Sequence, residues 1–113
     1  MQDLILITLF FIIDGIILIA LGIPLLQGHV SPNSWYGFRT RKTLSDEKIW
    51  YTVNHIAGKD MILAGALIII SSIILLALGG HVGFGWVAAT LVTVTLLAVG
   101  WMVIHGYSVL RRM

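Results

Sequence analysis

The sequence predicts an all-α membrane protein with three transmembrane helices and an amphipathic helix between the first two. Hydrophobic residues make up 58% of the 113-residue chain, and the mean hydropathy is +1.00. A soluble domain of this size cannot cover so much apolar surface. Three apolar runs are each long enough to cross a hydrocarbon core of about 30 Å. Between the first two lies a polar segment, residues 31–59, which holds five of the seven Lys and Arg residues.

The first apolar run covers residues 4–26 and contains one charged residue, Asp14. No basic region precedes it and no small-x-small cleavage site follows, so we expect a membrane span and not a cleavable signal peptide. Pro24 lies near its end and is expected to kink or end the helix, because proline removes a backbone donor.

The polar segment begins as a loop, since Pro32, Asn33 and Gly37 are turn-forming residues. A helix over residues 44–58 should follow, with a cap between Thr43 and Ser45 and acidic residues in its first turn. Its apolar residues recur at helical spacing and form one stripe: Ile49, Trp50, Val53, Ile56 and Ala57. Such a helix lies flat on the membrane, packs beneath the bundle or continues into the second span.

The second and third spans are predicted over residues 61–78 and 86–110, joined by a glycine-rich connection from Gly79 to Gly85. Three spans place the polar segment and the C-terminus on one side of the membrane. All seven Lys and Arg residues fall on that side. The positive-inside rule therefore predicts a bacterial cytoplasmic membrane protein whose N-terminus is outside and whose polar segment and C-terminus are cytoplasmic.

Asp14 is the first candidate functional residue. A carboxylate at the centre of a span costs about 2.5–3.5 kcal/mol on insertion scales, so it should face the bundle and find a partner. It is either a proton, cation or ligand site, or a protonated packing residue. Three residues on its side of the helix should let another helix approach: Gly15, Leu18 and Gly22. Hydroxyl groups on the other two spans lie at matching depth: Ser71, Ser72, Thr93 and Thr95.

Two further groups of polar residues are candidates. His105, near the cytoplasmic end of the third span, titrates near neutral pH, pairs with a residue of the polar segment, or is a satisfied histidine at the membrane interface. Arg39, Arg41 and Lys42 form a basic cluster. They contact anionic headgroups, or Arg39 folds back onto a carboxylate, for which the candidates are Asp46, Glu47 and Asp60.

Helix packing is indicated in two places. Trp50, Asn54 and Gly58 are spaced by four residues, which favours close contact with another helix. On the third span a small-residue face predicts packing within the protomer or between copies in a homo-oligomer: Ala89, Thr93, Leu96 and Gly100.

Several function classes are disfavoured by the composition. The basic residues form no nucleic-acid-binding face. His29, His55 and His81 lack metal-ligand spacing, and there is no cysteine, so we expect no metal site and no cofactor. No nucleophile–base pair or phosphate loop is present, which argues against an enzyme.

Residues 33–58 resemble the signature of the SdpI/YfhL family of bacterial membrane proteins, in which a polar segment lies between membrane spans. The order and spacing of the residues carry this resemblance: Asn33, Tyr36, Gly37, Arg39, Thr40, Thr43, Leu44, Trp50, Asn54 and Gly58. The resemblance implies a three-span module and transfers the candidate site residues Asn33, Tyr36, Gly37, Arg39, Thr40, Trp50, Asn54 and Gly58.

The family's best-known member protects its cell from a secreted peptide toxin and signals by holding a transcriptional repressor at the membrane. The resemblance therefore implies immunity to a membrane-active peptide, with a toxin and a cytoplasmic regulator as partners alongside the lipid bilayer. The alternative is a small, oligomeric proton- or ion-coupled transporter built around Asp14. A third interpretation is a structural subunit of a larger complex.

Overall fold

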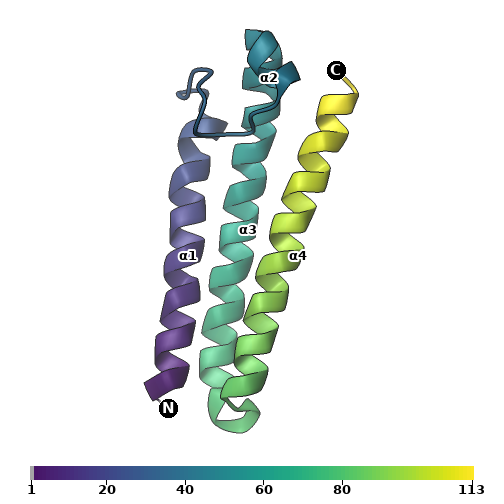
Figure 1. Ribbon diagram of the computed structural model, residues 1–113. Coiled ribbons are helices and arrows are strands. Elements are labelled where there is room, and N and C mark those ends of the chain that lie inside the picture. Colours follow the sequence, from purple (N-terminus) through teal and green to yellow (C-terminus); the bar gives the residue numbers. More distant parts are fainter. Residues whose placement is uncertain (1) are drawn as a thin grey trace.

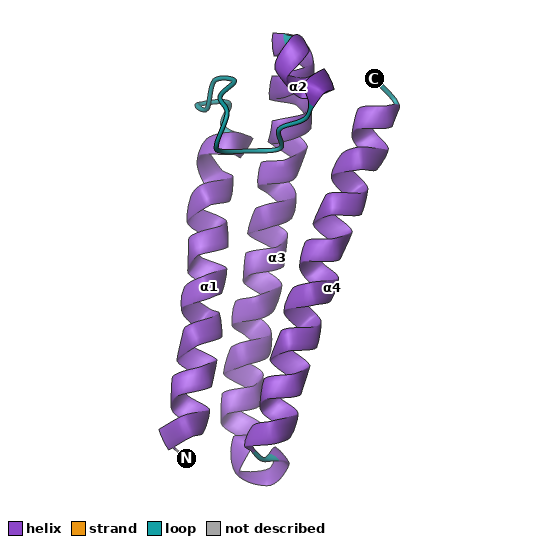
Figure 2. Ribbon diagram, viewed as in Figure 1, coloured by secondary structure: helices purple, strands orange, loops and turns teal. Residues whose placement is uncertain are grey.

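The computed structural model describes residues 2–113 and consists of four helices (Figures 1 and 2). They are α1 (Gln2–Leu26), α2 (Arg41–Ser45), α3 (Glu47–Val82) and α4 (Phe84–Arg111). By length and composition, α1, α3 and α4 can each cross a membrane. The predicted fold class is confirmed: the chain is all-helical, with three long apolar helices and a short helix between the first two.

Helix α3 is the centre of the bundle, with α1 antiparallel to it on one side and α4 antiparallel on the other (Figure 1). Helices α1 and α4 make few contacts with each other. The loop before α2 and the C-terminus lie at one end of the bundle, here called the loop end. Residue Gln2 and the turn at Gly83 lie at the other, the hairpin end. All seven Lys and Arg residues belong to the half of the bundle at the loop end.

The contact between α1 and α3 depends on two pairs of glycines. A Cβ built on Gly58 would lie 2.5 Å from the carbonyl oxygen of Gly22, and one built on Gly22 would lie 2.6 Å from that of Gly58. Gly15 and Gly65 face each other in the same way, at 2.7 and 2.5 Å. The two backbones therefore touch directly, as small residues allow in membrane helices. The expected close approach at Gly15 and Gly22 is confirmed.

The amphipathic segment 44–58 is continuous with the second span. Gly58 does not interrupt α3, whose 36 residues correspond to about 54 Å at about 1.5 Å per residue. A hydrocarbon core is only about 30 Å thick, so the first turns of α3 project beyond it. Of the three arrangements open to this helix, lying flat on the membrane is therefore wrong.

Several predicted boundaries need correction. The N-cap residue of α3 is Asp46, whose Oδ1 accepts a hydrogen bond from the Lys48 N–H at 2.8 Å. It is not a residue between Thr43 and Ser45, as the sequence predicted. Most of the glycine-rich connection is helical, because α3 runs to Val82 and α4 begins two residues later. Helix α1 passes through Pro24 and ends at Leu26 as predicted.

The end of α1 is fixed by a glycine. Gly28 has a φ of +72°, in the left-handed region that glycine adopts without a steric penalty. Its N–H donates to the Leu25 carbonyl at 3.3 Å, and the His29 N–H donates to the Pro24 carbonyl at 3.0 Å. Both carbonyls would otherwise be unpaired at a helix terminus. The chain then turns back over the bundle.

Candidate functional site

Residues 27–46 form a compact unit over the loop end, here called the cap, which contains the signature residues from Asn33 to Leu44. Its first turn is organised by Asn33, whose Oδ1 accepts hydrogen bonds from the N–H groups of Trp35 at 3.0 Å and Tyr36 at 2.6 Å. The Asn33 amide also donates to the Ser31 carbonyl at 2.9 Å. This side chain replaces backbone pairing that the loop lacks, as asparagine commonly does in turns.

Trp50 and Asn54 of α3 anchor the cap to the bundle. The Trp50 side chain is 0% exposed, and its Nε1–H donates to the Val30 carbonyl at 2.8 Å. Asn54 is 2% exposed; its Oδ1 accepts from the Phe38 N–H at 2.6 Å, and its amide donates to the Phe38 carbonyl at 3.4 Å. One amide thus pairs with both backbone groups of a loop residue.

Gly37 lies where the loop backbone passes close to α3. Its φ is +105°, which L side chains rarely adopt. A Cβ there would lie 2.8 Å from Asn54 Oδ1 and 3.3 Å from the Trp50 ring. The sequence predicted that Trp50, Asn54 and Gly58 would pack against another helix. Gly58 does pack against α1, whereas Trp50 and Asn54 contact the loop.

Replacing Asn54 with leucine should release the cap from α3. Leucine has a similar size but leaves the N–H and C=O of Phe38 without their partner, at a cost of about 1–3 kcal/mol for such an unsatisfied pair. Hydrogen exchange in nanodiscs should show faster exchange at residues 35–38 and little change within α4. Thr52→Val is the matched control, because Thr52 is exposed and its side chain, among residues 2–113, bonds only to the Lys48 carbonyl of its own helix. Equal exchange in the two variants would contradict the anchor.

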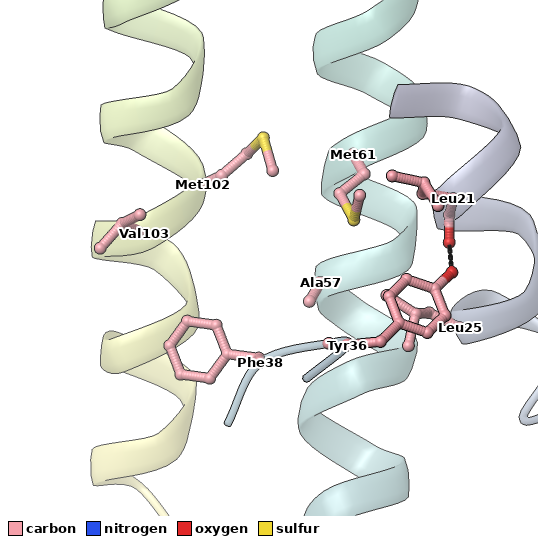
Figure 3. Close-up of a pocket in the computed structure, with 9 residues that line it drawn as sticks. Leu21, Leu25, Tyr36, Phe38, Ala57, Met61, Met102 and Val103 are labelled. Atoms are coloured by element: carbon pink, nitrogen blue, oxygen red, sulfur yellow. Dashed lines mark hydrogen bonds between the residues drawn. The ribbon is translucent and has the colours of Figure 1, made fainter. Parts of the chain in front are cut away.

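Tyr36 and Phe38 spread to opposite sides of the bundle and roof a pocket of about 200 Å³ (Figure 3). The Tyr36 hydroxyl donates to the Leu21 carbonyl of α1. Phe38 meets Tyr107 of α4 edge-on, with ring centroids 5.1 Å apart. Burial raises the pKa of Tyr36 above its usual value of 10.0, so the folded state favours the protonated phenol. Any stability from this group is present below pH 10 and is lost as the pH rises through the folded-state pKa.

The remaining part of the cap carries charge. Thr40 caps α2, accepting a hydrogen bond from the Thr43 N–H at 3.1 Å while its own N–H donates to the Thr43 hydroxyl at 2.7 Å. The Lys42 ammonium donates to the Leu110 carbonyl at the end of α4, at 3.0 Å. Arg39 is exposed and forms no hydrogen bond or ion pair with residues 2–113. The interpretation that Arg39 pairs with a carboxylate therefore does not hold in this structure.

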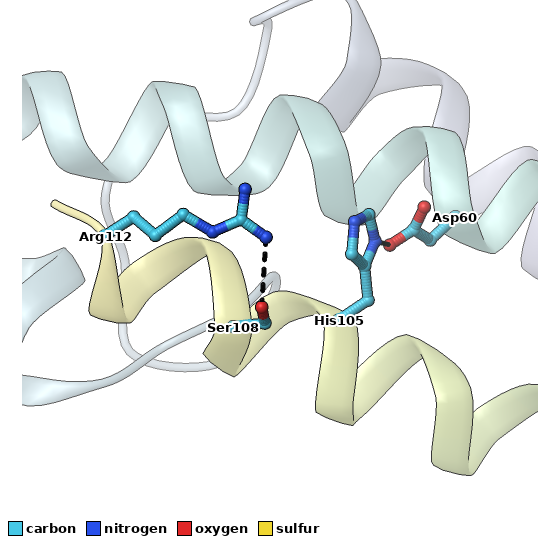
Figure 4. Close-up of polar contacts among 4 residues, drawn as sticks. All are labelled: Asp60, His105, Ser108 and Arg112. Carbon is cyan, nitrogen blue, oxygen red and sulfur yellow. Dashed lines mark hydrogen bonds and ion pairs between the residues drawn. The ribbon is translucent and has the colours of Figure 1, made fainter.

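Just below the cap, His105 and Asp60 join α4 to α3 (Figure 4). The Nδ1 atom of His105 lies 2.6 Å from Oδ2 of Asp60, whose side chain is buried. The imidazole stacks on Trp101, with ring centroids 5.3 Å apart and planes at 14°. The partner of His105 is thus not a residue of the polar segment, which one interpretation expected, but Asp60, the residue directly after it. Asp60 was one of the three acids considered as a partner of Arg39.

Replacing His105 with alanine should destabilise the α3–α4 contact. The buried Asp60 carboxyl loses its partner, which costs about 1–3 kcal/mol for a buried group left unsatisfied. Unfolding in mixed micelles, followed by circular dichroism, measures this loss. His105→Gln keeps a hydrogen-bond donor and should retain part of the stability. Equal loss in both variants would indicate that the ring stack, and not the hydrogen bond, is what matters.

Asp14 is not brought to the cap. It lies half-buried in the middle of α1, and its carboxyl forms no hydrogen bond or ion pair within residues 2–113. Among the hydroxyls expected at its depth, Ser72 and Thr93 instead donate to carbonyls of their own helices, at 2.7 and 2.8 Å. The Thr95 hydroxyl is buried and has no partner among the described residues. The expected intramolecular partner of Asp14 is therefore absent from this part of the chain.

Other contacts were missed by sequence reasoning. His55 places Nδ1 2.8 Å from the Leu26 carbonyl, at the terminus of α1. The sequence does indicate that the carbonyls at the end of the first span need hydrogen-bond donors, because every helix ends in unpaired carbonyls. It does not indicate that His55 of the next helix lies beside them. Residues 2–113 contain no group of three or more His, Cys, Asp or Glu side chains that could hold a metal ion.

The fold and the cap define the class of this molecule: a multi-pass helical membrane protein with a polar segment folded over one end of its bundle. Its family follows from comparison with known proteins. The chain belongs to the SdpI/YfhL protein family, whose model matches residues 29–106. The matched region contains residues 29–46 of the cap, all of α3 and most of α4, and it leaves out α1 with Asp14.

A curated relative is similar over a shorter region. The chain is 45% identical over 38 residues to the uncharacterized protein YfhL of Bacillus subtilis (strain 168). The alignment covers 34% of this chain and 34% of that protein. No solved structure matches the chain.

Proposed function

We propose that this protein confers immunity to a membrane-active peptide toxin or bacteriocin, and that it acts by binding and not by catalysis. One observation carries the proposal: most signature residues of a family that includes an immunity protein lie in the cap or anchor it to α3 by hydrogen bonds. A second, signalling role through a cytoplasmic regulator would use the same face. Two findings support the proposal: the chain belongs to this family, and hydrogen bonds hold the cap in one conformation.

The cap also indicates which residues are free to recognise a partner. Asn33, Gly37, Trp50 and Asn54 are engaged in holding the loop. Arg39 is the signature residue whose side chain has no such task, because it is exposed and unpaired within residues 2–113. A guanidinium in this position recognises carboxylates and phosphates through two parallel hydrogen bonds. It is therefore the working residue in this proposal.

The proposal includes an orientation in the bacterial cytoplasmic membrane: cap and C-terminus in the cytoplasm, N-terminus outside. It is supported by the seven Lys and Arg residues gathered at the loop end, since positive loops are retained inside. The chain has no cysteine, so single substitutions report the side of the membrane. An impermeant maleimide applied to intact cells should label His81→Cys and spare Ser34→Cys. Labelling of Ser34→Cys alone would reverse the orientation.

The function is tested by survival of a sensitive bacterial host expressing this chain and challenged with a panel of membrane-active peptides. Wild-type protein should protect selectively, and Arg39→Ala should remove protection at equal membrane levels. Arg41→Ala is the matched control, because it removes an exposed positive charge from the same cluster and should retain protection. Full protection by Arg39→Ala would reject Arg39 as the working residue; absence of protection by wild type would reject immunity against that panel.

Transport is the second candidate, and one observation favours it. A carboxyl group in the middle of a span has no partner within residues 2–113, and intramembrane acids commonly mark ion or proton sites. One copy encloses no pathway, because α1 and α4 hardly touch, so transport requires a homo-oligomer. Ala89, Thr93 and Leu96 are exposed on α4 and offer a packing face. Proton flux in liposomes that disappears in Asp14→Asn would support this candidate; flux unchanged by the substitution would reject it.

A further inference from the structure

The pocket beneath Tyr36 and Phe38 lies between the three long helices, directly under the cap. Its walls come from α1, α3 and α4 near the loop end, and the loop closes it on the polar side (Figure 3). The pocket is not fully enclosed, and α1 and α4, which form two of its walls, are scarcely in contact with each other. Its volume is about 200 Å³, and its lining is almost wholly apolar.

The lining favours a flexible apolar chain. Met61 and Met102 face each other across the pocket from α3 and α4 (Figure 3). Methionine side chains are unbranched and polarisable, so they adapt to an occupant without a fixed shape. A transmembrane helix with its side chains is about 10 Å wide, which is much wider than a single acyl chain. An acyl chain is narrower and is always present at this depth.

A positive charge lies next to the roof of the pocket in the sequence, as an anionic lipid headgroup needs. Arg39 directly follows Phe38, the roof residue, and is exposed without a partner in residues 2–113. The acids of the loop end do not neutralise it. Asp60 is engaged with His105, the Asp46 carboxylate caps α3, and neither Asp46 nor Glu47 forms an ion pair within residues 2–113. Basic residues next to an apolar cleft at the membrane surface attract anionic headgroups.

We propose that this pocket is a binding site for an anionic glycerophospholipid. One acyl chain enters between α1 and α4 and lies against Met61 and Met102. The phosphate sits above the roof, within reach of the Arg39 guanidinium, which can donate two hydrogen bonds to it. The bound lipid fills the space between the cap and the two outer helices. This inference shares Arg39 with the immunity proposal, but its readout is lipid binding by the purified protein and does not involve a toxin.

Native mass spectrometry of the purified protein, titrated with phosphatidylglycerol or with phosphatidylcholine of the same chains, tests the site. Wild type should bind one phosphatidylglycerol preferentially. Arg39→Ala should lower its affinity about fivefold, the effect of one basic residue near an anionic headgroup, with little effect on phosphatidylcholine. Lys48→Ala is the charge control, since Lys48 is exposed in the first turn of α3 and does not line the pocket.

A second pair of variants tests the pocket. Val103 lines it and is 46% exposed, so Val103→Phe can narrow the pocket without disturbing a core. Val99 lies one turn away, is 40% exposed and does not line the pocket, which makes Val99→Phe the matched control. Val103→Phe should weaken binding of both lipids, and Val99→Phe should not. Equal binding by these two variants, or an equal loss in Arg39→Ala and Lys48→Ala, would overturn the site and leave general surface attraction.

Discussion

Replacing Trp50 with alanine is expected to cost about 3–5 kcal/mol of unfolding free energy, the range for truncating a large buried aromatic residue. The side chain is fully buried and holds the start of the cap through its hydrogen bond to the Val30 carbonyl. It also supports the loop at Gly37. Unfolding in mixed micelles followed by circular dichroism gives the stability, and limited proteolysis should show new cleavage between residues 27 and 46.

Two companion variants separate the causes. Trp50→Phe keeps most of the ring and loses the hydrogen bond, which should cost about 1–3 kcal/mol because the Val30 carbonyl is left unpaired. Trp35 is 80% exposed, so Trp35→Ala should change stability by less than about 0.5 kcal/mol. If Trp50→Ala were no less stable than Trp35→Ala, the cap would not depend on this anchor.

Adding one methyl group at Gly58 is expected to destabilise the bundle by about 1–3 kcal/mol, the usual cost of overpacking. The new Cβ would lie 2.5 Å from the Gly22 carbonyl oxygen and 2.6 Å from the Leu26 nitrogen. Both are backbone atoms, which cannot rotate away as a side chain can, so α1 must shift. The same micelle unfolding measures the effect, and Gly22→Ala should behave alike because the contact is reciprocal.

Gly100→Ala is the control for this substitution. Gly100 also lies inside a helix, but a Cβ there would have nothing within 4 Å. Alanine favours helix by up to about 1 kcal/mol relative to glycine, so this variant should be as stable as wild type or more stable. A loss of stability at Gly100 equal to that at Gly58 would show that helix propensity, and not the contact between α1 and α3, decides the result.

The spans were predictable because apolar length is a local property of the sequence. The predicted run 4–26 agrees with α1, and residues 61–78 and 86–110 lie within α3 and α4. The course of residues 44–58 was not predictable, since an apolar stripe is equally suited to a membrane surface and to a folded loop. In the structure, Trp50 and Val53 of this stripe are fully buried beneath the cap.

The candidate site likewise has features that were predictable from the sequence and features that were not. The turn at Asn33 and the freedom of Gly37 follow from local chemistry and were predicted. Contacts that depend on the register between helices were not, as the pairing of His105 with Asp60 shows. The expected partner of Asp14 was wrong for the same reason, because residues at equal depth in two helices need not face each other. The Ser72 hydroxyl instead donates a hydrogen bond to a carbonyl of its own helix.

The central claim is that the loop carrying the signature residues folds back over the bundle and reaches α4. Since the chain has no cysteine, cross-linking in native membranes tests this directly. The Phe38 and Tyr107 rings are in edge contact, with centroids 5.1 Å apart. Phe38→Cys with Tyr107→Cys should form an intramolecular link with a short bismaleimide, detected by mass spectrometry. Phe38→Cys with Trp86→Cys, at the hairpin end, should not. Absence of the first link at full labelling of both thiols would contradict the cap.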